Sequence, residues 1–311
     1  MSQNKEQHYV SKFILRNWSN NGKTINIWIG KNETILKEVS ISSQFKKNWI
    51  YGYNSKIEKI LFANDIEPKM SEFIKEIREK KTIFNDERPQ RFILSSLFRT
   101  KYFIELNEHN INKIASFVCK DIEKYGYDKE RFKLETLEAL DLIENSRIKG
   151  YEDMFYQCDS LWPVVKTLKK VTLLKTNKEF IIGEIPVVFI CPNMGRIIDP
   201  LFMIIYPISP KELLVLYRPE DGNINENRTL SDAETHILNS YQFQQTEDIV
   251  CFNDESQIEF DIFENQYGVL NKYEKLSKIM IGENSDDYIF IPYTIQGLHF
   301  YYDEGLMGIF S

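Results

Sequence analysis

The chain has 311 residues, of which 42% are apolar and 14% aromatic, so it can bury a substantial core. Its longest apolar runs, at 187–191 and 201–206, fall far short of the roughly 20 residues that a membrane-spanning helix needs, and no secretion signal opens the sequence. We therefore expect a cytoplasmic protein with no membrane segment. The four widely spaced cysteines indicate neither a zinc knuckle nor a disulfide framework.

The first predicted element is a β-hairpin near the N-terminus. Between residues 13 and 39 the pattern is typical of short strands, and the run Thr24–Ile29 alternates in polarity as a half-buried strand does. The sequence Asn-Asn-Gly at 20–22 supplies a turn.

Helical spacing follows from about residue 54. Ser55 and Glu58 form a capping-box pattern, and Pro68 fits the first turn of a further helix that we expect to end near residue 81. Dense apolar residues over 88–103 predict a helix that is buried on much of its surface. Cleaner apolar stripes predict two more helices, at 107–125 and 128–145.

After residue 162 the pattern changes to short β-rich runs that are separated by turn-forming residues. Their close spacing favours an antiparallel meander, because βαβ units would need intervening helices. A second capping box, Ser231 with Glu234, predicts one returning helix, and strands are expected at 288–293 and near 299–302. The β-rich runs are 171–174, 180–182, 187–191, 201–208 and 213–217. The predicted fold class is α+β: an N-terminal β-hairpin and a helical half, then an antiparallel-sheet half with one returning helix.

The net charge of −7 conceals a difference between the two halves of the chain. Residues 1–150 hold 27 Lys and Arg against 21 Asp and Glu, a balance of +6, which leaves 12 against 25, or −13, for residues 151–311. Such a contrast is typical of a half that faces nucleic acid, and equally of two halves that attract each other. We expect these halves to meet near Gly150 within one continuous globular unit.

No common catalytic signature is present: the sequence lacks a Gly-x-Gly-x-x-Gly turn, a phosphate-binding Gly-Lys-Ser/Thr loop, His-Glu-x-x-His and Gly-x-Ser-x-Gly. The four histidines lack a second histidine at metal-ligand spacing. The most distinctive stretch is residues 8–18, His-Tyr-Val-Ser-Lys-Phe-Ile-Leu-Arg-Asn-Trp, in which His8, Arg16 and Asn17 accompany an apolar framework. This stretch resembles the His-Tyr-Val-Pro-x-Phe-x-Leu-Arg-Asn-Phe opening of a bacterial domain-of-unknown-function family, DUF4238.

Weaker similarities to that family extend along nearly the whole chain. Two isoleucine-glutamate pairs, an Arg-Thr helix, a strand-turn, a Pro-x-Ser-Pro run and a late asparagine resemble its landmarks. They lie at 57–58, 66–67, 97–100, 180–188, 207–210 and Asn239. The resemblance implies a role in bacterial anti-phage defence, without a defined reaction.

The chain departs from the family pattern at three places. Ser11 and Lys101 stand where the family has prolines, and Gly183-Glu184-Ile185 replaces Ser-Asp-Asn. If the aspartate of relatives is catalytic, the longer Glu184 implies that this member is altered or inactive.

Two residues of the opening stretch are candidates for chemistry. His8 is able to exchange a proton near neutral pH, or to fix the N-terminus through a structural hydrogen bond. Arg16 is suited to clamping a phosphate, or to bridging a carboxylate such as Glu58 that would hold the hairpin against the helices.

The remaining candidates are an arginine and three glutamates. Arg99 lies in an otherwise apolar helix, so it must pair with an acid or reach a ligand. Glu58 and Glu67 both have structural explanations, as a capping-box residue and as a first-turn acid that favours a helix N-terminus. Glu184 lies in a glycine-proline turn, where side chains often meet ligands.

Two functions follow from these residues. The first is a nuclease-like toxin, a hydrolase that uses Mg²⁺ or Mn²⁺ and acts on nucleic acid. Acids among Glu58, Glu67 and Glu184 would hold the metal ion. His8 would transfer a proton, and Arg16 and Arg99 would bind the phosphate of the substrate. The second is a sensor or binding module, in which the same residues form a network or recognise a phage component, such as a phage protein.

Overall fold

The computed structural model describes residues 6–48, 57–101, 162–190, 203–221, 223–246 and 248–258, with Lys113, Ser116 and three short strands beyond residue 277. Helices and strands are both present, so the predicted α+β class is confirmed. The helices predicted at 107–125 and 128–145 lie outside the described residues, apart from Lys113 and Ser116, which are helical. Among the described residues, no helix is long and apolar enough to cross a bilayer.

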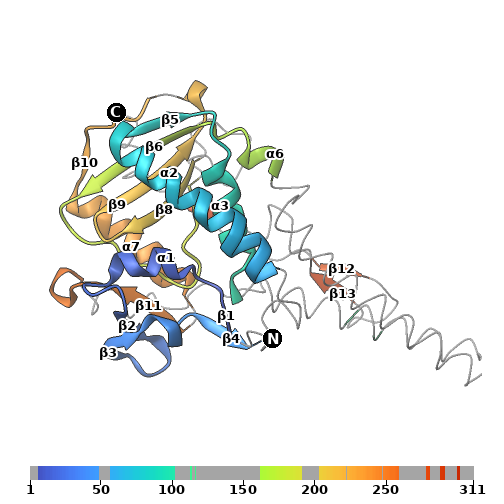
Figure 1. The fold of residues 1–311 in the computed structure, drawn as a ribbon, viewed down its shortest axis with the longest axis vertical. Helices are drawn as coiled ribbons and strands as arrows, with labels where there is room; N and C mark the ends of the chain where they lie inside the picture. Colours follow the sequence, from blue (N-terminus) through green and yellow to red (C-terminus); the bar gives the residue numbers. More distant parts are fainter. Residues whose placement is uncertain are drawn as a thin grey trace, which may run out of the picture.

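A mixed sheet forms the centre of the described fold (Figure 1). Its order is β10-β6-β9-β8-β7-β14, and β5 pairs with β6. The strands β7, β8, β9 and β6 are antiparallel, as predicted, whereas β10 and β14 add to the two ends in parallel. The bounds are β5 Thr82–Phe84, β6 Lys170–Thr176, β7 Val188–Ile190, β8 Met203–Ser209, β9 Glu212–Tyr217, β10 Thr229–Leu230 and β14 Phe300–Tyr301.

Strand β8 is buried at every position, because both faces of the sheet are covered. Helices α2 (Glu67–Lys80) and α3 (Arg88–Phe98) lie side by side across one face (Figure 1). Helix α2 begins with Pro68 in its first turn and buries residues that repeat at helical spacing, Met70, Phe73, Ile74 and Ile77. Its predicted position is therefore confirmed.

Helix α3 ends earlier than its apolar pattern predicts. The expected helix ran to residue 103, but α3 stops at Phe98, and Arg99 and Thr100 form a turn. Upstream of α2, residues 57–66 form a π-helical run that continues into it, and the predicted cap at Ser55 lies outside the described residues.

The predicted N-terminal hairpin is confirmed as β2 (Thr24–Ile29) with β3 (Thr34–Ser40), and β11 (Ile249–Phe252) extends it into a three-stranded sheet. The Asn-Asn-Gly turn at 20–22 leads into β2, and a 3-10 turn at Gly30–Asn32 connects the two strands. Contrary to expectation, the preceding stretch is a short helix, α1 (Lys12–Leu15), followed by a 3-10 turn at Arg16–Trp18.

Smaller elements complete the described fold. Strand β1 (Glu6–His8) pairs with β4 (Lys46–Asn48), and β12 (Lys278–Met280) pairs with β13 (Tyr288–Phe290). The others are α6 at Trp162–Val165 and 3-10 turns at Ile41–Ser43, Pro219–Asp221 and Glu255–Gln257.

The returning helix, α7 (Asp232–Gln245), begins at the predicted capping box, in which Ser231 and Glu234 each bond the backbone of the other. The segment at 180–182 does not form the expected strand, and its β-pairing with the described residues is a single bridge between Ile182 and Cys251. The Ile181 amide instead donates to the side chain of Asn239 in this helix. The boundary expected near Gly150 falls among residues outside the described part and stays a prediction.

Candidate functional site

The extended segment 8–11 lies between elements that come from distant parts of the chain. Strand β1 ends at His8, the Tyr9 amide donates to Phe45 O at 2.9 Å, and Ser11 is the N-cap of α1. This stretch contacts two polar groups: the His8 carbonyl and the Ser11 hydroxyl belong to one, and the Tyr9 hydroxyl belongs to the other.

The first polar group surrounds Arg99, whose side chain is buried, with 2% of its surface exposed. Its Nε and Nη2 donate to the His8 carbonyl at 3.1 and 2.7 Å. Its Nη1 donates to Ser11 Oγ and to Glu67 Oε1, both at 2.8 Å. The guanidinium also lies 4.0 Å from the ring centroid of Phe62, a typical cation–π distance.

Glu67, the first residue of α2, is the carboxylate that neutralises Arg99. Its Oε1 also accepts a 2.7 Å hydrogen bond from Ser11. Burial alone would raise the pKa of Glu67, but the charge of Arg99 and the hydrogen bonds from Arg99 and Ser11 hold that pKa below its usual value. Glu67 is therefore ionised at neutral pH, as the ion pair requires.

His8 is buried beside this pair and remains neutral. Burial, followed by the positive charges of Lys12 and Arg99, lowers the pKa of His8 from 6.5 to about 4. A general base works best when its pKa lies near the operating pH, so His8 is poorly suited to that task here.

The second polar group surrounds Glu184, which is 2% exposed. The Tyr9 hydroxyl donates to its Oε1 at 2.9 Å, and the Asp248 amide donates to its Oε2 at 2.7 Å. Burial raises the pKa of Glu184, although both hydrogen bonds act in the opposite direction. Lys101, two residues after Arg99, pairs with the Asp248 carboxylate at 2.7 Å. This ion pair is a second link between the Arg99 group and the Glu184 group, besides the segment 8–11.

Helix α7 holds the segment that carries Glu184. Asn239 donates to Glu179 O at 2.8 Å and accepts from the Ile181 amide at 3.1 Å. Gln242 accepts from the Gly183 amide at 3.0 Å, and Gln245 donates to Val187 O at 3.4 Å. These amides replace the ladder hydrogen bonds that a strand would have made, which is why the segment is ordered without being a strand.

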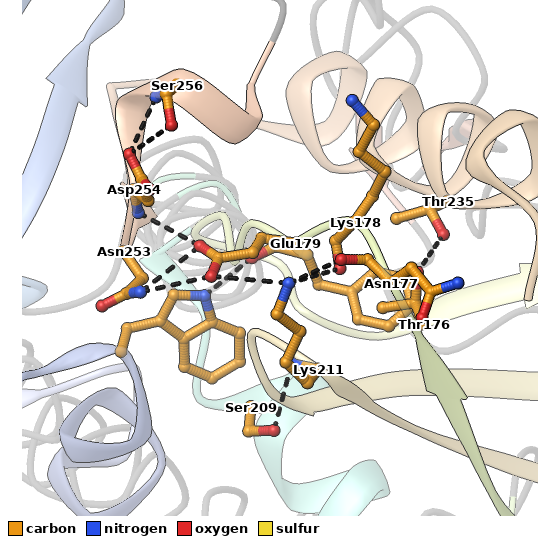
Figure 2. Close-up of polar contacts among 12 residues, drawn as sticks. Thr176, Asn177, Lys178, Glu179, Ser209, Lys211, Thr235, Asn253, Asp254 and Ser256 are labelled. Carbon is orange, nitrogen blue, oxygen red and sulfur yellow. Dashed lines mark hydrogen bonds and ion pairs between the residues drawn. The ribbon is translucent and has the colours of Figure 1, made fainter. Parts of the chain in front are cut away.

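Glu179 anchors the start of the same segment (Figure 2). Its carboxylate accepts from the Asp254 amide at 3.1 Å and from Asn253 Nδ2 at 3.3 Å. Figure 2 shows Lys211 reaching across from the turn between β8 and β9, with its Nζ 2.7 Å from Asn177 O and 3.6 Å from the Glu179 carboxylate. The segment is therefore held at both ends.

The family model described as "Protein of unknown function (DUF4238)" matches residues 6–256, which is most of the chain. The chain belongs to the DUF4238 family. No curated protein and no solved structure matches it. The described contacts join several of the landmarks on which the resemblance rests: the opening stretch, the residues near 67, 99 and 184, and Asn239.

The second half of the DUF4238 opening stretch bonds the backbone of the large sheet and of the segment that carries Glu184. Asn17 Nδ2 donates to Ile208 O in β8 at 2.6 Å, and Trp18 Nε1 donates to Phe180 O at 2.9 Å. Arg16 is different, because it is exposed and forms no ion pair with any carboxylate in the described ranges. The structure thus brings together His8, Glu67, Arg99 and Glu184 and leaves Arg16 outside their network.

The predicted metal site involves Glu58 and Glu67. The side chain of Glu58 lies outside the described residues, and the described contacts of Glu67 are with Arg99 and Ser11. No group of three acidic, histidine or cysteine side chains suited to a metal ion occurs in the part of the chain that is described. Magnesium or manganese at Glu58 and Glu67 stays a prediction.

Sequence reasoning missed several members of this network, among them Tyr9, Ser11, Gln242 and Gln245. The first two lie inside the opening stretch, where Ser11 stands at the position of a family proline. The two glutamines follow Asn239 at intervals of three residues on α7. Such a polar stripe within a buried helix is the signal that could have revealed them.

Proposed function

We propose that this protein is a bacterial anti-phage defence component that works as a non-catalytic sensor or binding module. The proposal rests mainly on Arg99. Its guanidinium donates four hydrogen bonds, to His8, Ser11 and Glu67, and the side chain is 2% exposed. A phosphate would have to displace Glu67 to reach it.

The other candidate groups support the same conclusion. Both oxygens of the Glu184 carboxylate accept hydrogen bonds from the protein, and the imidazole of His8 is buried and neutral. A buried network of hydrogen bonds of this kind specifies one arrangement of the chain. In this proposal it fixes the shape of the module, and a phage component contacts groups on the surface.

Arg16 is the candidate for such a contact. It belongs to the opening stretch and is exposed, while its neighbours Asn17 and Trp18 fix the backbone that carries it. Its planar guanidinium suits an acidic partner surface. The anti-phage part of the proposal comes from the family resemblance alone.

The test is a plaque assay on cells that express the wild type, Arg16→Glu or Lys23→Glu. We expect the wild type and Lys23→Glu to reduce plaque formation, and Arg16→Glu to lose protection at unchanged protein level. Lys23 is the control because it is also an exposed cation near the hairpin. Equal protection by all three proteins would remove Arg16 from the proposal.

The competing function is the nuclease-type hydrolase. Purified protein is incubated with RNA and DNA in Mg²⁺ or Mn²⁺, with a chelated control. Under the sensor proposal both nucleic acids stay intact. Degradation that chelation stops, and that copurifies with the wild type through successive columns, would overturn it in favour of the hydrolase.

A further inference from the structure

A buried lysine that has no acidic partner among the described residues lies at the end of β6, away from the network described above. Lys170 is 6% exposed. Its cross-strand neighbours are Phe84 in β5 and Tyr217 in β9. The Nζ atom lies 5.1 Å from the centroid of the Phe84 ring and 5.2 Å from that of Tyr217, so the ammonium group contacts both aromatic rings.

The hydrogen-bond acceptor of this ammonium is the neutral amide of Asn223, through Oδ1. No carboxylate in the described ranges forms an ion pair with Lys170, whereas Lys101, Lys211 and others pair with acids. Burying an ammonium without a counter-charge is costly, and ring faces offset only part of that cost. Since an ammonium has three N–H donors, the Asn223 bond leaves donors for another acceptor.

An exposed aromatic surface lies beside this charge. Phe84 is 54% exposed, although large apolar side chains are usually buried. Its position is fixed, because β5 pairs with β6 and the following Asn85 amide donates to Lys169 O at 2.8 Å. The backbone that carries the exposed ring is therefore held in place, and a flat group can stack on the ring.

The loop that follows β9 is rich in amides. Asn223 is exposed, so it can be displaced or turned, and its amide offers a donor as well as an acceptor. The next residue is fixed, since the Ile224 amide donates to the Tyr217 hydroxyl at 3.3 Å. A side chain that can turn on a fixed backbone is suited to closing over a small ligand.

We propose that Lys170, Phe84 and Asn223 form a binding site for a small anion that carries an aromatic ring, such as a nucleoside monophosphate. The Lys170 ammonium binds the anionic group, the Phe84 ring stacks on the base, and the Asn223 amide donates to the anion. This site does not depend on the proposed function.

The experiment is calorimetric titration of the full chain with adenosine monophosphate, adenosine and inorganic phosphate. We expect the monophosphate to bind the wild type more tightly than either fragment, because it alone uses both the ammonium and the ring. Phe84→Ala weakens binding of the monophosphate and leaves that of phosphate unchanged. Absence of monophosphate binding at millimolar concentration overturns the proposal.

Asn223→Asp is the decisive variant because it supplies the missing carboxylate from an exposed loop position. We expect it to raise the dissociation constant of the monophosphate about tenfold or more, and to raise the melting temperature, because Lys170 gains an ion pair. Asn227→Asp is the matched control: Asn227 lies in the same loop beside the exposed Lys81, 2.5 Å from its Nζ. Equal weakening in both variants would show a general charge effect and overturn the site.

Discussion

The hydroxyl of Tyr9 donates a 2.9 Å hydrogen bond to Glu184, which lies 175 positions later in the chain. The carbonyl of the preceding residue, His8, accepts a hydrogen bond from Arg99, 91 positions away. Two consecutive residues thus join a buried carboxylate and a buried guanidinium that are carried by different parts of the fold. The family landmarks are far apart in the sequence, yet several of them are contacts of this one network.

The Arg99–Glu67 pair should contribute strongly to stability. Arg99→Met leaves Glu67 and the His8 carbonyl without their charged donor, and we expect it to lower the free energy of unfolding by about 3 kcal/mol. Arg16→Met is the control, because Arg16 is exposed, and it should change that free energy by less than about 0.5 kcal/mol. Urea denaturation measures both. Similar losses in the two variants would contradict the network.

His8 should make stability depend on pH. The folded pKa is about 4 and the ordinary value 6.5, so folding favours the neutral form. The contribution of His8 to the free energy of unfolding is fully present above pH 6.5 and is lost as the pH falls through 4. The difference between the two pKa values corresponds to roughly 3 kcal/mol.

His8→Gln tests this, because glutamine keeps a polar side chain that does not titrate. Between pH 7 and pH 5 the wild type should lose more free energy of unfolding in urea than the variant does. Glu67 has the same sign, but its lowered pKa places its effect at more acidic pH. Parallel pH profiles for the two proteins would show that His8 titrates normally.

Gly183 should not tolerate a side chain. A Cβ atom there would lie 2.3 Å from Thr246 Oγ1 and 3.1 Å from Gln242 O, which belongs to the backbone of α7. We expect Gly183→Ala to destabilise the fold by about 1–3 kcal/mol through overpacking. Thr246→Ala removes the nearer atom, so the double variant should melt at a higher temperature than Gly183→Ala alone. No such rescue would mean that the helix is not this close.

Asn239 should contribute strongly to stability, because its side chain bonds two backbone groups. Asn239→Leu leaves the Glu179 carbonyl and the Ile181 amide without partners, and each buried unsatisfied group costs about 1–3 kcal/mol. Gln244→Leu, on the same helix but half-exposed, should cost less because water reaches the site. Thermal melting compares the two variants, and a larger loss for Gln244→Leu would contradict the role of Asn239.

Local chemistry in the sequence was enough to predict several elements. The capping box at Ser231 and the first-turn Pro68 place α7 and α2, and the alternating residues of 24–29 place β2. The end of α3 could not be predicted this way. Its apolar pattern continues past Arg99, but the guanidinium is held by residues from elsewhere in the fold, and the chain turns there.

The sequence by itself determined the α+β class, the family, and the need of a buried arginine at position 99 for a partner. Each depends on residue types and on spacings of a few positions, which act through local backbone geometry and the cost of burying charge. Only the tertiary structure decided that Glu67 is this partner, that Tyr9 bonds Glu184, and that Arg16 is left exposed. Such choices depend on which distant elements pack together, because a hydrogen bond forms only where folding brings donor and acceptor within about 3 Å.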